Sequence, residues 1–414
     1  MKITWLRQLR SEITPHLHCT EDARAAARRR LPRLIFDFVD GAAGSEMAAC
    51  SNLTALEQIR LQPRVLVSAT NRRLAKRFLG TAMGLPFGIA PMGMCNLAWP
   101  GADCMLSAEA VRREIPLCLS IAASTALEPM RVAAGERAWF QLYVGQSVGA
   151  AMQLVDRAEA AGYEVLVLTV DVPEVGRRIR DLRNGFQVPF KLGARQFLDF
   201  ARHPRWSLAT LLHGVPRPMN YESAHNGNTF TRQESRGRTD WAFLERLRQR
   251  WKGRLIVKGV LSGDDAIGIK RAGADAIYVS NHGGRQLGAA PAAINALPVI
   301  RAAVGADYPL LFDSGVRNGE AIVKALALGA DFVMLGRPFL YAIGADGARG
   351  LTTLIDVLAE EIDITLAQLG RASVEDIDRS VLADVHADLA PNQQNSSAIR
   401  VVADAGSAAV RNER

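Results

Sequence analysis

Short apolar runs alternate with helical segments along most of this chain, and that alternation limits the folds it can adopt. The apolar runs cover residues 86–90, 117–120, 138–143, 165–170, 255–258, 276–280, 310–313 and 332–336. Amphipathic stretches that suit helices lie between them, for example 148–161, 263–272 and 319–328. Strands that alternate with helices pair in parallel, and eight such units close a TIM barrel. We therefore predict an α/β fold, a TIM (β/α)8 barrel. A doubly wound sheet is less favoured because no GxGxxG motif follows the first run.

The remaining segments predict how the chain is organised around this barrel. Residues 1–60 read as an N-terminal helical cap, and 61–370 as the barrel. A long insertion, 172–253, follows the fourth strand, and 371–414 form a C-terminal tail. The end of that tail, from 391, is rich in Asn, Gln, Ser and Ala and is expected to be poorly ordered. The first ten residues lack an apolar segment, so we expect no signal peptide.

Composition narrows the classes of partner. The chain has 414 residues and a formal net charge of +8, which favours small anions or an acidic membrane surface. No run of like charges is long enough for a nucleic-acid arm, and no apolar segment is long enough to span a membrane. The five cysteines form no CxxC pair, which predicts reduced thiols in a cytoplasmic protein and no metal site.

The ends of the predicted strands carry polar residues or glycine at all eight positions. TIM barrels place their chemistry at this face. The sixth strand ends in a loop that holds His282 and Arg285 on either side of Gly283 and Gly284. Histidine exchanges a proton near neutral pH, and arginine binds carboxylate or phosphate. This loop predicts an active site, although a surface arginine and a satisfied histidine in an ordinary turn would share its pattern.

One group of strand-end residues suits a phosphate and a conjugated ring. The loops 313–317 and 336–337 offer glycine N–H groups and the guanidiniums of Arg317 and Arg337. Lys258 could stabilise negative charge on a reduced ring, or it could form a buried ion pair. Hydrogen bonds to the edge of a heterocycle are available from Ser120, Gln141 and Thr169. Together these residues predict flavin mononucleotide, FMN.

A second group suits a small carboxylate with a hydroxyl to oxidise. His282 is the candidate base, and Asp171 could orient its imidazole. Arg178 and Arg285 could bind a carboxylate, and Tyr143 could donate to a developing oxyanion. The plain alternatives are a solvated Arg178 and a Tyr143 that belongs to the core.

The insertion is basic and aromatic in its first half, from Arg177 to Trp206. Loops of this length are usually lids or binding loops. Three interpretations stay open: a lid over the active site, a contact with an anionic membrane, and an oligomer contact.

The same motifs resemble those of the FMN-dependent 2-hydroxy acid dehydrogenase and oxidase family, which includes glycolate oxidase, from about residue 25 to 370. The motifs are Arg30-Leu31-Pro32, Phe140-Gln141-Leu142-Tyr143, Leu168-Thr169-Val170-Asp171, Val257-Lys258-Gly259, Ser280-Asn281-His282-Gly283-Gly284-Arg285-Gln286-Leu287, Asp313-Ser314-Gly315-Val316-Arg317 and Gly336-Arg337. Within the family the chain is most similar to bacterial membrane-associated L-lactate and (S)-mandelate dehydrogenases.

The resemblance implies specific roles for these residues. His282 would be the base, Asp171 its partner, and Arg178, Arg285 and Tyr143 the substrate contacts. FMN would be bound by Pro91, Met92, Gly93, Ser120, Gln141, Thr169, Lys258, Ser280, Asp313, Gly315, Arg317, Gly336 and Arg337. The family usually has tyrosine at the substrate-binding position of Phe38, so the substrate of this chain could differ. The family also often has aspartate at the position of Gly288, after the Arg-Gln-Leu motif.

The resemblance also implies a reaction. An (S)-2-hydroxy acid resembling mandelate or lactate would be oxidised to the 2-oxo acid, with hydride leaving C2 as His282 takes the hydroxyl proton. A carbanion route would use the same residues. Electrons would pass to a quinone or similar acceptor, from an enzyme in the cytoplasm or on the inner face of the membrane, and a homotetramer is implied. The alternatives are an oxidase, an enzyme for another anionic substrate, and a non-catalytic flavin-binding scaffold.

Overall fold

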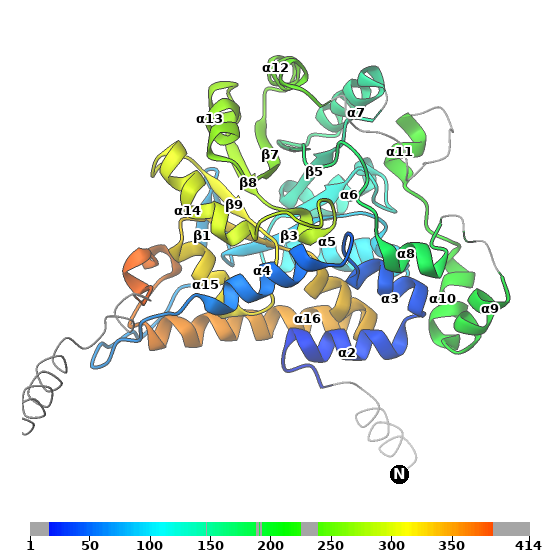
Figure 1. The fold of residues 1–414 in the computed structure, drawn as a ribbon, viewed down its shortest axis with the longest axis horizontal. Coiled ribbons are helices and arrows are strands. Elements are labelled where there is room, and N and C mark those ends of the chain that lie inside the picture. Colours follow the sequence, from blue (N-terminus) through cyan, green and yellow to red (C-terminus); the bar gives the residue numbers. More distant parts are fainter. Residues whose placement is uncertain (1–15, 146, 188–189, 191–192, 225–238, 384–414) are drawn as a thin grey trace, which may run out of the picture.

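Eight parallel strands form a closed barrel in the order β10-β3-β4-β5-β6-β7-β8-β9 (Figure 1). The computed structural model describes residues 16–383, apart from 146, 188–189, 191–192 and 225–238. The predicted TIM barrel is confirmed, and so is the position of the insertion after the fourth barrel strand. The strands are β3 (Phe87–Met92), β4 (Leu117–Ser120), β5 (Ala138–Leu142), β6 (Val165–Thr169), β7 (Arg254–Val260), β8 (Ala276–Val279), β9 (Leu310–Phe312) and β10 (Phe332–Leu335). Both faces of these strands are covered, which is why they read as continuous apolar runs.

Helices surround the barrel, and short polar caps start several of them. They are α5 (Ala102–Arg112), α6 (Leu127–Ala134), α7 (Val148–Ala160), α12 (Trp241–Arg250), α13 (Gly263–Arg271), α14 (Ala293–Val304), α15 (Gly319–Ala327) and α16 (Arg337–Gln368). The side chains of Ser147, Asp240, Ser262 and Asn318 each accept a hydrogen bond from a backbone N–H of the first turn of their helix. Such caps satisfy amides that a helix N-terminus leaves without partners.

The barrel interior has an apolar lower half that a small hairpin closes. Cys118, Trp139, Leu311, Phe332 and Met334 are among the buried residues that fill it. A hairpin of β1 (Lys76–Phe78) and β2 (Thr81–Met83) adds Phe78, whose ring centroid is 5.4 Å from that of Phe332. The sequence pattern did not predict this hairpin, because three-residue strands carry too short an alternation to be recognised.

Three helices of the N-terminal cap bring backbone and side chains to the barrel mouth. They are α2 (Thr20–Arg30), α3 (Arg33–Asp40) and α4 (Met47–Gln58). Helix α2 packs along α16, and the two run side by side below the barrel in Figure 1. Helix α4 contacts the loop that follows β8. The first fifteen residues of the predicted cap lie outside the described part of the chain.

The described residues of the insertion form four short helices before α12. They are α8 (Ile179–Asn184), α9 (Ala194–Ala201), α10 (Pro204–His213) and α11 (Met219–Ala224). Helix α8 packs against α3, while α9 and α10 lie at the edge of the molecule (Figure 1). After α16 the chain forms two 3-10 turns, Val374–Asp376 and Arg379–Val381, and Leu382 pairs with Leu61. Residues 384–414, which include the segment predicted to be poorly ordered, lie outside the described residues.

Candidate active site

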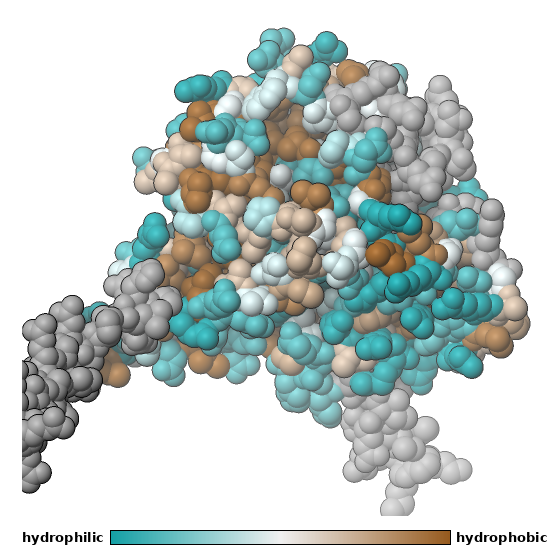
Figure 2. Space-filling model, in the orientation of Figure 1, coloured by the Kyte–Doolittle hydropathy of each residue, from teal (hydrophilic) through white to brown (hydrophobic). Residues whose placement is uncertain are grey.

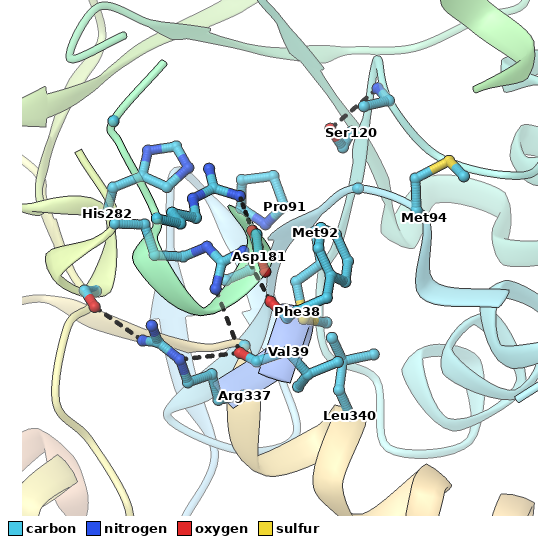
Figure 3. A pocket seen from close by; sticks show the side chains of 18 of the residues that line it. Phe38, Val39, Pro91, Met92, Met94, Ser120, Asp181, His282, Arg337 and Leu340 are labelled. Atoms are coloured by element: carbon cyan, nitrogen blue, oxygen red, sulfur yellow. Dashed lines mark hydrogen bonds and ion pairs between the residues drawn. The ribbon is translucent and has the colours of Figure 1, made fainter. Parts of the chain in front are cut away.

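A cavity of about 1570 Å³ opens at the carboxyl ends of the barrel strands. Most residues predicted for the site line it: Phe38, Pro91, Met92, Gly93, Ser120, Tyr143, Arg178, Lys258, His282, Arg285, Asp313, Gly315, Arg317, Gly336 and Arg337. Figure 3 shows His282, Phe38, Met92 and Arg337 facing this space. Gln141, Thr169, Asp171 and Ser280 stand behind the lining, at the ends of their strands. The site is therefore assembled from all eight strands and from the cap and the insertion.

His282 is held between a carboxylate and a phenol. Its Nδ1 lies 3.1 Å from Asp171 Oδ1 and 3.2 Å from Oδ2, and its Nε2 lies 3.4 Å from the Tyr143 hydroxyl. Because a carboxylate can only accept, Nδ1 carries the proton and Nε2 is left as a base that faces the cavity. This is the arrangement in which a carboxylate orients an imidazole for proton transfer.

Burial and neighbouring charges set the protonation states of this pair. Burial is the main cause that lowers the pKa of His282 below its ordinary value of 6.5, and Lys258 lowers it further against the opposing effect of Asp171. Burial also tends to raise the pKa of Asp171, but the charges of His282 and Lys258 outweigh it and the pKa is lowered. At neutral pH the pair is a neutral imidazole next to a carboxylate, as a general base requires.

Two glycines let the loop after β8 fold tightly against its neighbours. A Cβ on Gly283 (φ +62°) would lie 2.5 Å from Arg337 Nη1, and one on Gly284 (φ +75°) would lie 2.5 Å from the backbone nitrogen of Ala49. The two glycines therefore leave room for these protein atoms, and they give the chain a left-handed turn beside His282.

Lys258 is a fully enclosed cation at the end of β7. Its Nζ donates to Ser280 Oγ at 2.9 Å, lies 3.6 Å from Asp313 Oδ2, and sits 5.0 Å from the centre of the Tyr278 ring. Burial alone would lower the pKa of Lys258, but Asp313 and Asp171 outweigh burial and raise it. The ion pair proposed as the plain alternative is thus present, and it keeps the lysine charged at the barrel mouth.

Two guanidiniums bind the C-terminal end of α3. Arg285 donates to the carbonyl oxygens of Phe38 at 2.9 Å and Gly41 at 2.6 Å. Arg337 donates to Gly41 O at 2.9 Å and to Gly283 O at 2.8 Å, and Figure 3 shows it beside Val39. The last carbonyl groups of a helix lack partners within the helix and attract cations. The cap therefore fixes two arginines that the sequence had assigned to ligands alone.

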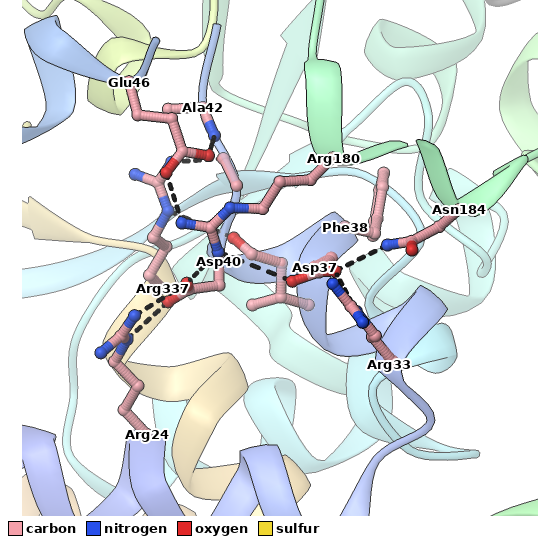
Figure 4. A network of polar contacts seen from close by, with 12 residues as sticks. Arg24, Arg33, Asp37, Phe38, Asp40, Ala42, Glu46, Arg180, Asn184 and Arg337 are labelled. Atoms are coloured by element: carbon pink, nitrogen blue, oxygen red, sulfur yellow. Dashed lines mark hydrogen bonds and ion pairs between the residues drawn. The ribbon is translucent and has the colours of Figure 1, made fainter. Parts of the chain in front are cut away.

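A network of charged side chains attaches the insertion to the cap (Figure 4). Arg180 of α8 contacts Asp40 at 2.7 Å and also binds Glu46. Arg24 of α2 binds Asp40 from the other side at 2.6 Å, and the Asn184 amide donates to Asp37 at 2.6 Å. This network holds α8, and with it Arg178, over the cavity. Arg178 lies 3.9 Å from the buried carboxylate of Asp181, which also lines the cavity.

The chemistry of the donor set fits FMN. Gln141 Nε2 and Thr169 Oγ1 are buried and have no hydrogen-bond partner among the described residues, so both can still bond to the edge of a flavin ring. Burial lowers the pKa of Arg317, and the adjacent guanidinium of Arg337 lowers it further, which a bound phosphate would relieve. Bound FMN would supply a two-electron acceptor, and Lys258 lies beside Thr169 in the sheet.

Apart from Arg178, the sequence missed the cavity residues that the insertion contributes. The ring of Phe186 stacks on Phe38 with centroids 4.4 Å apart and planes 6° apart. Phe190, Val215 and Arg217 also line the cavity. The only signal for them was the aromatic and basic composition of the insertion, which does not say which of its side chains face inward.

A TIM barrel with a His–Asp pair, a buried lysine and paired guanidiniums at its mouth suits a flavin-dependent oxidoreductase, and comparison with known proteins gives its family. A model of the FMN-dependent dehydrogenase family matches residues 27–384, and the chain belongs to that family. It is therefore an FMN-dependent enzyme of the 2-hydroxy acid dehydrogenase type.

Individual relatives agree with this assignment. The chain is 38% identical over 369 residues to L-lactate dehydrogenase of Pseudomonas syringae pv. syringae, covering 87% of this chain and 97% of the relative. It is 38% identical over 363 residues to (S)-mandelate dehydrogenase of Pseudomonas putida, covering 86% and 92%. The solved structure of the monotopic membrane protein (S)-mandelate dehydrogenase has a TM-score of 0.84 at 36% identity, covering 89% of this chain and 99% of that one.

Proposed function

We propose that this enzyme oxidises an (S)-2-hydroxy acid to the 2-oxo acid with His282 as the catalytic base. The observation that carries the proposal is the position of His282, whose Nδ1 is bound by Asp171 and whose Nε2 faces Tyr143 and the cavity. A hydroxyl placed at Nε2 would lose its proton to the imidazole. Asp171 would stabilise the resulting imidazolium, and Tyr143 would donate to the oxygen.

Positive charge around the cavity would orient the substrate carboxylate. Arg178 comes from the insertion and Arg285 from the loop after β8, and both line the cavity. Two charge-assisted contacts would fix the acid end and leave C2 and its hydroxyl toward His282. Ser120, Gln141, Thr169 and Lys258 would hold the flavin ring, and Arg317 and Arg337 its phosphate.

The wall of the cavity favours an acid with a bulky apolar or aryl side chain, mandelate-like more than lactate-like. Phe38 and Phe186 form a parallel stack, and the guanidinium of Arg285 lies 5.5 Å from the centre of the Phe38 ring. Phe190 and Met94 extend this apolar surface. A methyl group would leave most of it without contact, whereas a phenyl ring would bury it.

We further propose that the enzyme docks on the inner face of the cell membrane and passes electrons to a quinone. Among the described residues, Phe197, Leu198, Leu208, Leu211 and Leu212 on α9 and α10 are more than half exposed. Figure 2 shows apolar side chains at the edge where Figure 1 places α9 and α10, next to hydrophilic ones. Exposed apolar groups interleaved with arginine suit an anionic lipid surface. No described helix is long and apolar enough to cross a membrane.

The direct test is reduction of the bound flavin by candidate acids without oxygen. Lactate, glycolate, mandelate and phenyllactate would be mixed with the purified enzyme, and bleaching near 450 nm, roughly where oxidised flavins absorb, would be followed. We expect mandelate or phenyllactate to bleach the flavin fastest. If none of the acids bleaches it, the proposed reaction is wrong.

The acceptor and the assembly have their own tests. Reoxidation by a soluble quinone should be much faster than by air, and fast reaction with oxygen would instead identify an oxidase. A homotetramer, which the family resemblance implies, would be checked by light scattering of the purified protein.

A further inference from the structure

Ser314 has a backbone conformation that is unfavourable for serine. Its φ is +87°, in the left-handed region that residues with a side chain rarely adopt, and it lies directly before Gly315 at φ +92°. The residue is buried, with 7% of its surface exposed. Glycine would hold the same backbone without strain. A serine at such a position suggests that its hydroxyl makes contacts that glycine could not make.

That hydroxyl makes three hydrogen bonds, all within the site. Ser314 Oγ accepts from the backbone N–H of Asn281 at 3.2 Å and from that of Gly283 at 3.0 Å, and it donates to Asp313 Oδ1 at 2.8 Å. A hydroxyl has one donor and two acceptor positions, so its capacity is fully used. The two amides flank His282, whose own φ of +58° is also left-handed.

These bonds are part of a closed ring of polar contacts around His282. The other Asp313 oxygen lies 3.6 Å from Lys258 Nζ, which donates to Ser280 Oγ at 2.9 Å. Ser280 Oγ in turn accepts from the backbone N–H of His282 at 3.0 Å. The hydroxyls of Ser314 and Ser280 thus both accept hydrogen bonds from the backbone of the His282 loop. The chain after Ser314 is the proposed phosphate-binding loop, 315–317.

We propose that Ser314 is a positioning residue for the catalytic base, and that it couples the direction of His282 to the loop that holds the cofactor phosphate. This inference rests on the proposed role of His282. Without the hydroxyl, the amides of Asn281 and Gly283 would lose their acceptor and the loop would move relative to Asp171. The guanidinium of Arg285 is held by carbonyl groups at the end of α3, and that of Arg178 lies next to Asp181, so both would keep their positions.

Two variants separate the hydroxyl from the backbone strain. Ser314→Ala keeps the strained backbone and loses the hydroxyl, while Ser314→Gly loses the hydroxyl and relieves the strain. We expect both to reduce kcat by roughly 10- to 100-fold, since misplacing a catalytic group by about 1 Å can cost 10²-fold, with KM changed less than about threefold. The Gly variant should melt at a higher temperature than the Ala variant. Glu114→Gly, at an exposed positive-φ residue far from the cavity, is the control for relief of strain alone.

Readouts independent of turnover complete the test. Hydrogen exchange of the peptide covering 280–285 should become faster in both variants. The pKa of His282, followed by NMR, should fall as the imidazole moves away from Asp171, while Lys258, Arg178 and Tyr143 remain its other neighbours. Wild-type kcat in Ser314→Gly, or unchanged exchange and unchanged pKa of His282 in both variants, would overturn the proposal. If no acid reduces the wild-type flavin, the proposed function fails, while exchange and NMR still test the positioning.

Discussion

The two walls of the cavity are built in different ways. On the barrel side, Lys258, Ser280, Asp313 and Ser314 are buried and joined in one ring of polar contacts around His282. On the side of the insertion, Phe186 stacks on Phe38, and away from the cavity the helices α9 and α10 carry exposed leucines. One wall is polar and closely connected, and the other is apolar, basic and partly open to solvent.

The difference between the two walls suits them to two different functions. Proton transfer needs atoms held to fractions of an ångström, which a buried and fully bonded network provides. Selecting the side chain of a substrate, or docking on a membrane, needs a contact area of suitable chemistry. The exact positions of the contacting atoms matter less for these functions. Changes on the barrel wall should therefore affect the rate of reaction, and changes in the insertion should affect selectivity and location.

Replacing the base should have the largest effect. His282→Gln is expected to slow anaerobic flavin reduction by about 10²- to 10⁴-fold, the usual contribution of a general base, with FMN still bound. His213→Gln, at an exposed histidine in the insertion, should change the rate less than twofold. Stopped-flow absorbance measures both, and fast reduction in His282→Gln would refute the assignment of the base.

The pH profile tests the partner of the base. Because the pKa of His282 lies below 6.5, the neutral imidazole predominates above that pH, and kcat/KM should fall only as pH drops through that pKa. Asp171→Asn removes a charge that raises this pKa, so the acidic limb should move to lower pH. The rate on the plateau should fall by about 10- to 100-fold because the imidazolium loses its partner. A limb that stays in place would show that Asp171 does not act on His282.

Asp40 tests the connection between the two walls. Burial tends to raise the pKa of Asp40, but hydrogen bonds from Arg24, Tyr341 and Arg180 outweigh it and lower the pKa. Its stabilising contribution is therefore full above the ordinary aspartate pKa, about 3.9, and is lost as pH falls toward the lower folded value. Asp40→Asn should reduce the free energy of unfolding by about 1.5–3 kcal/mol at pH 7. Urea unfolding should show this difference from wild type shrinking in acid, and a constant difference would contradict the assignment.

Phe186 tests selectivity. Phe186→Ala should lower kcat/KM for mandelate by about tenfold, since a lost apolar contact of this size is worth roughly 1–2 kcal/mol. The value for lactate should change less than threefold, because a methyl group does not reach this ring. Equal losses for both acids would mean that Phe186 supports the fold of the site and does not select the substrate.

The surface of α10 should matter least for the reaction. Leu211→Asp with Leu212→Asp should reduce binding to anionic lipid vesicles several-fold, while reduction of the flavin by substrate stays within twofold. Val132→Asp, at an 86% exposed valine on α6, is the matched control. Co-sedimentation with vesicles measures the effect, and unchanged binding of the double variant would place the membrane contact elsewhere.

Much of the barrel wall could be predicted from the sequence. Strands that are buried on both faces leave continuous apolar runs, and the barrel requires that their ends meet, so His282 and Asp171 could be paired although 111 positions separate them. The insertion could not be predicted in the same way. Its residues reach the cavity through contacts with α3, such as Arg180 with Asp40, and no periodic pattern in the sequence specifies those contacts.

By itself the sequence determined the barrel, and it predicted the base, its partner and the residues that suit FMN, because each depends on strand order and on residue type at a strand end. Only the tertiary structure decided that Phe186 stacks on Phe38, and that carbonyl groups of α3 accept hydrogen bonds from Arg285 and Arg337. It also decided that the Ser314 hydroxyl accepts hydrogen bonds from the His282 loop. Those facts depend on distances between segments far apart in the chain, and packing sets such distances.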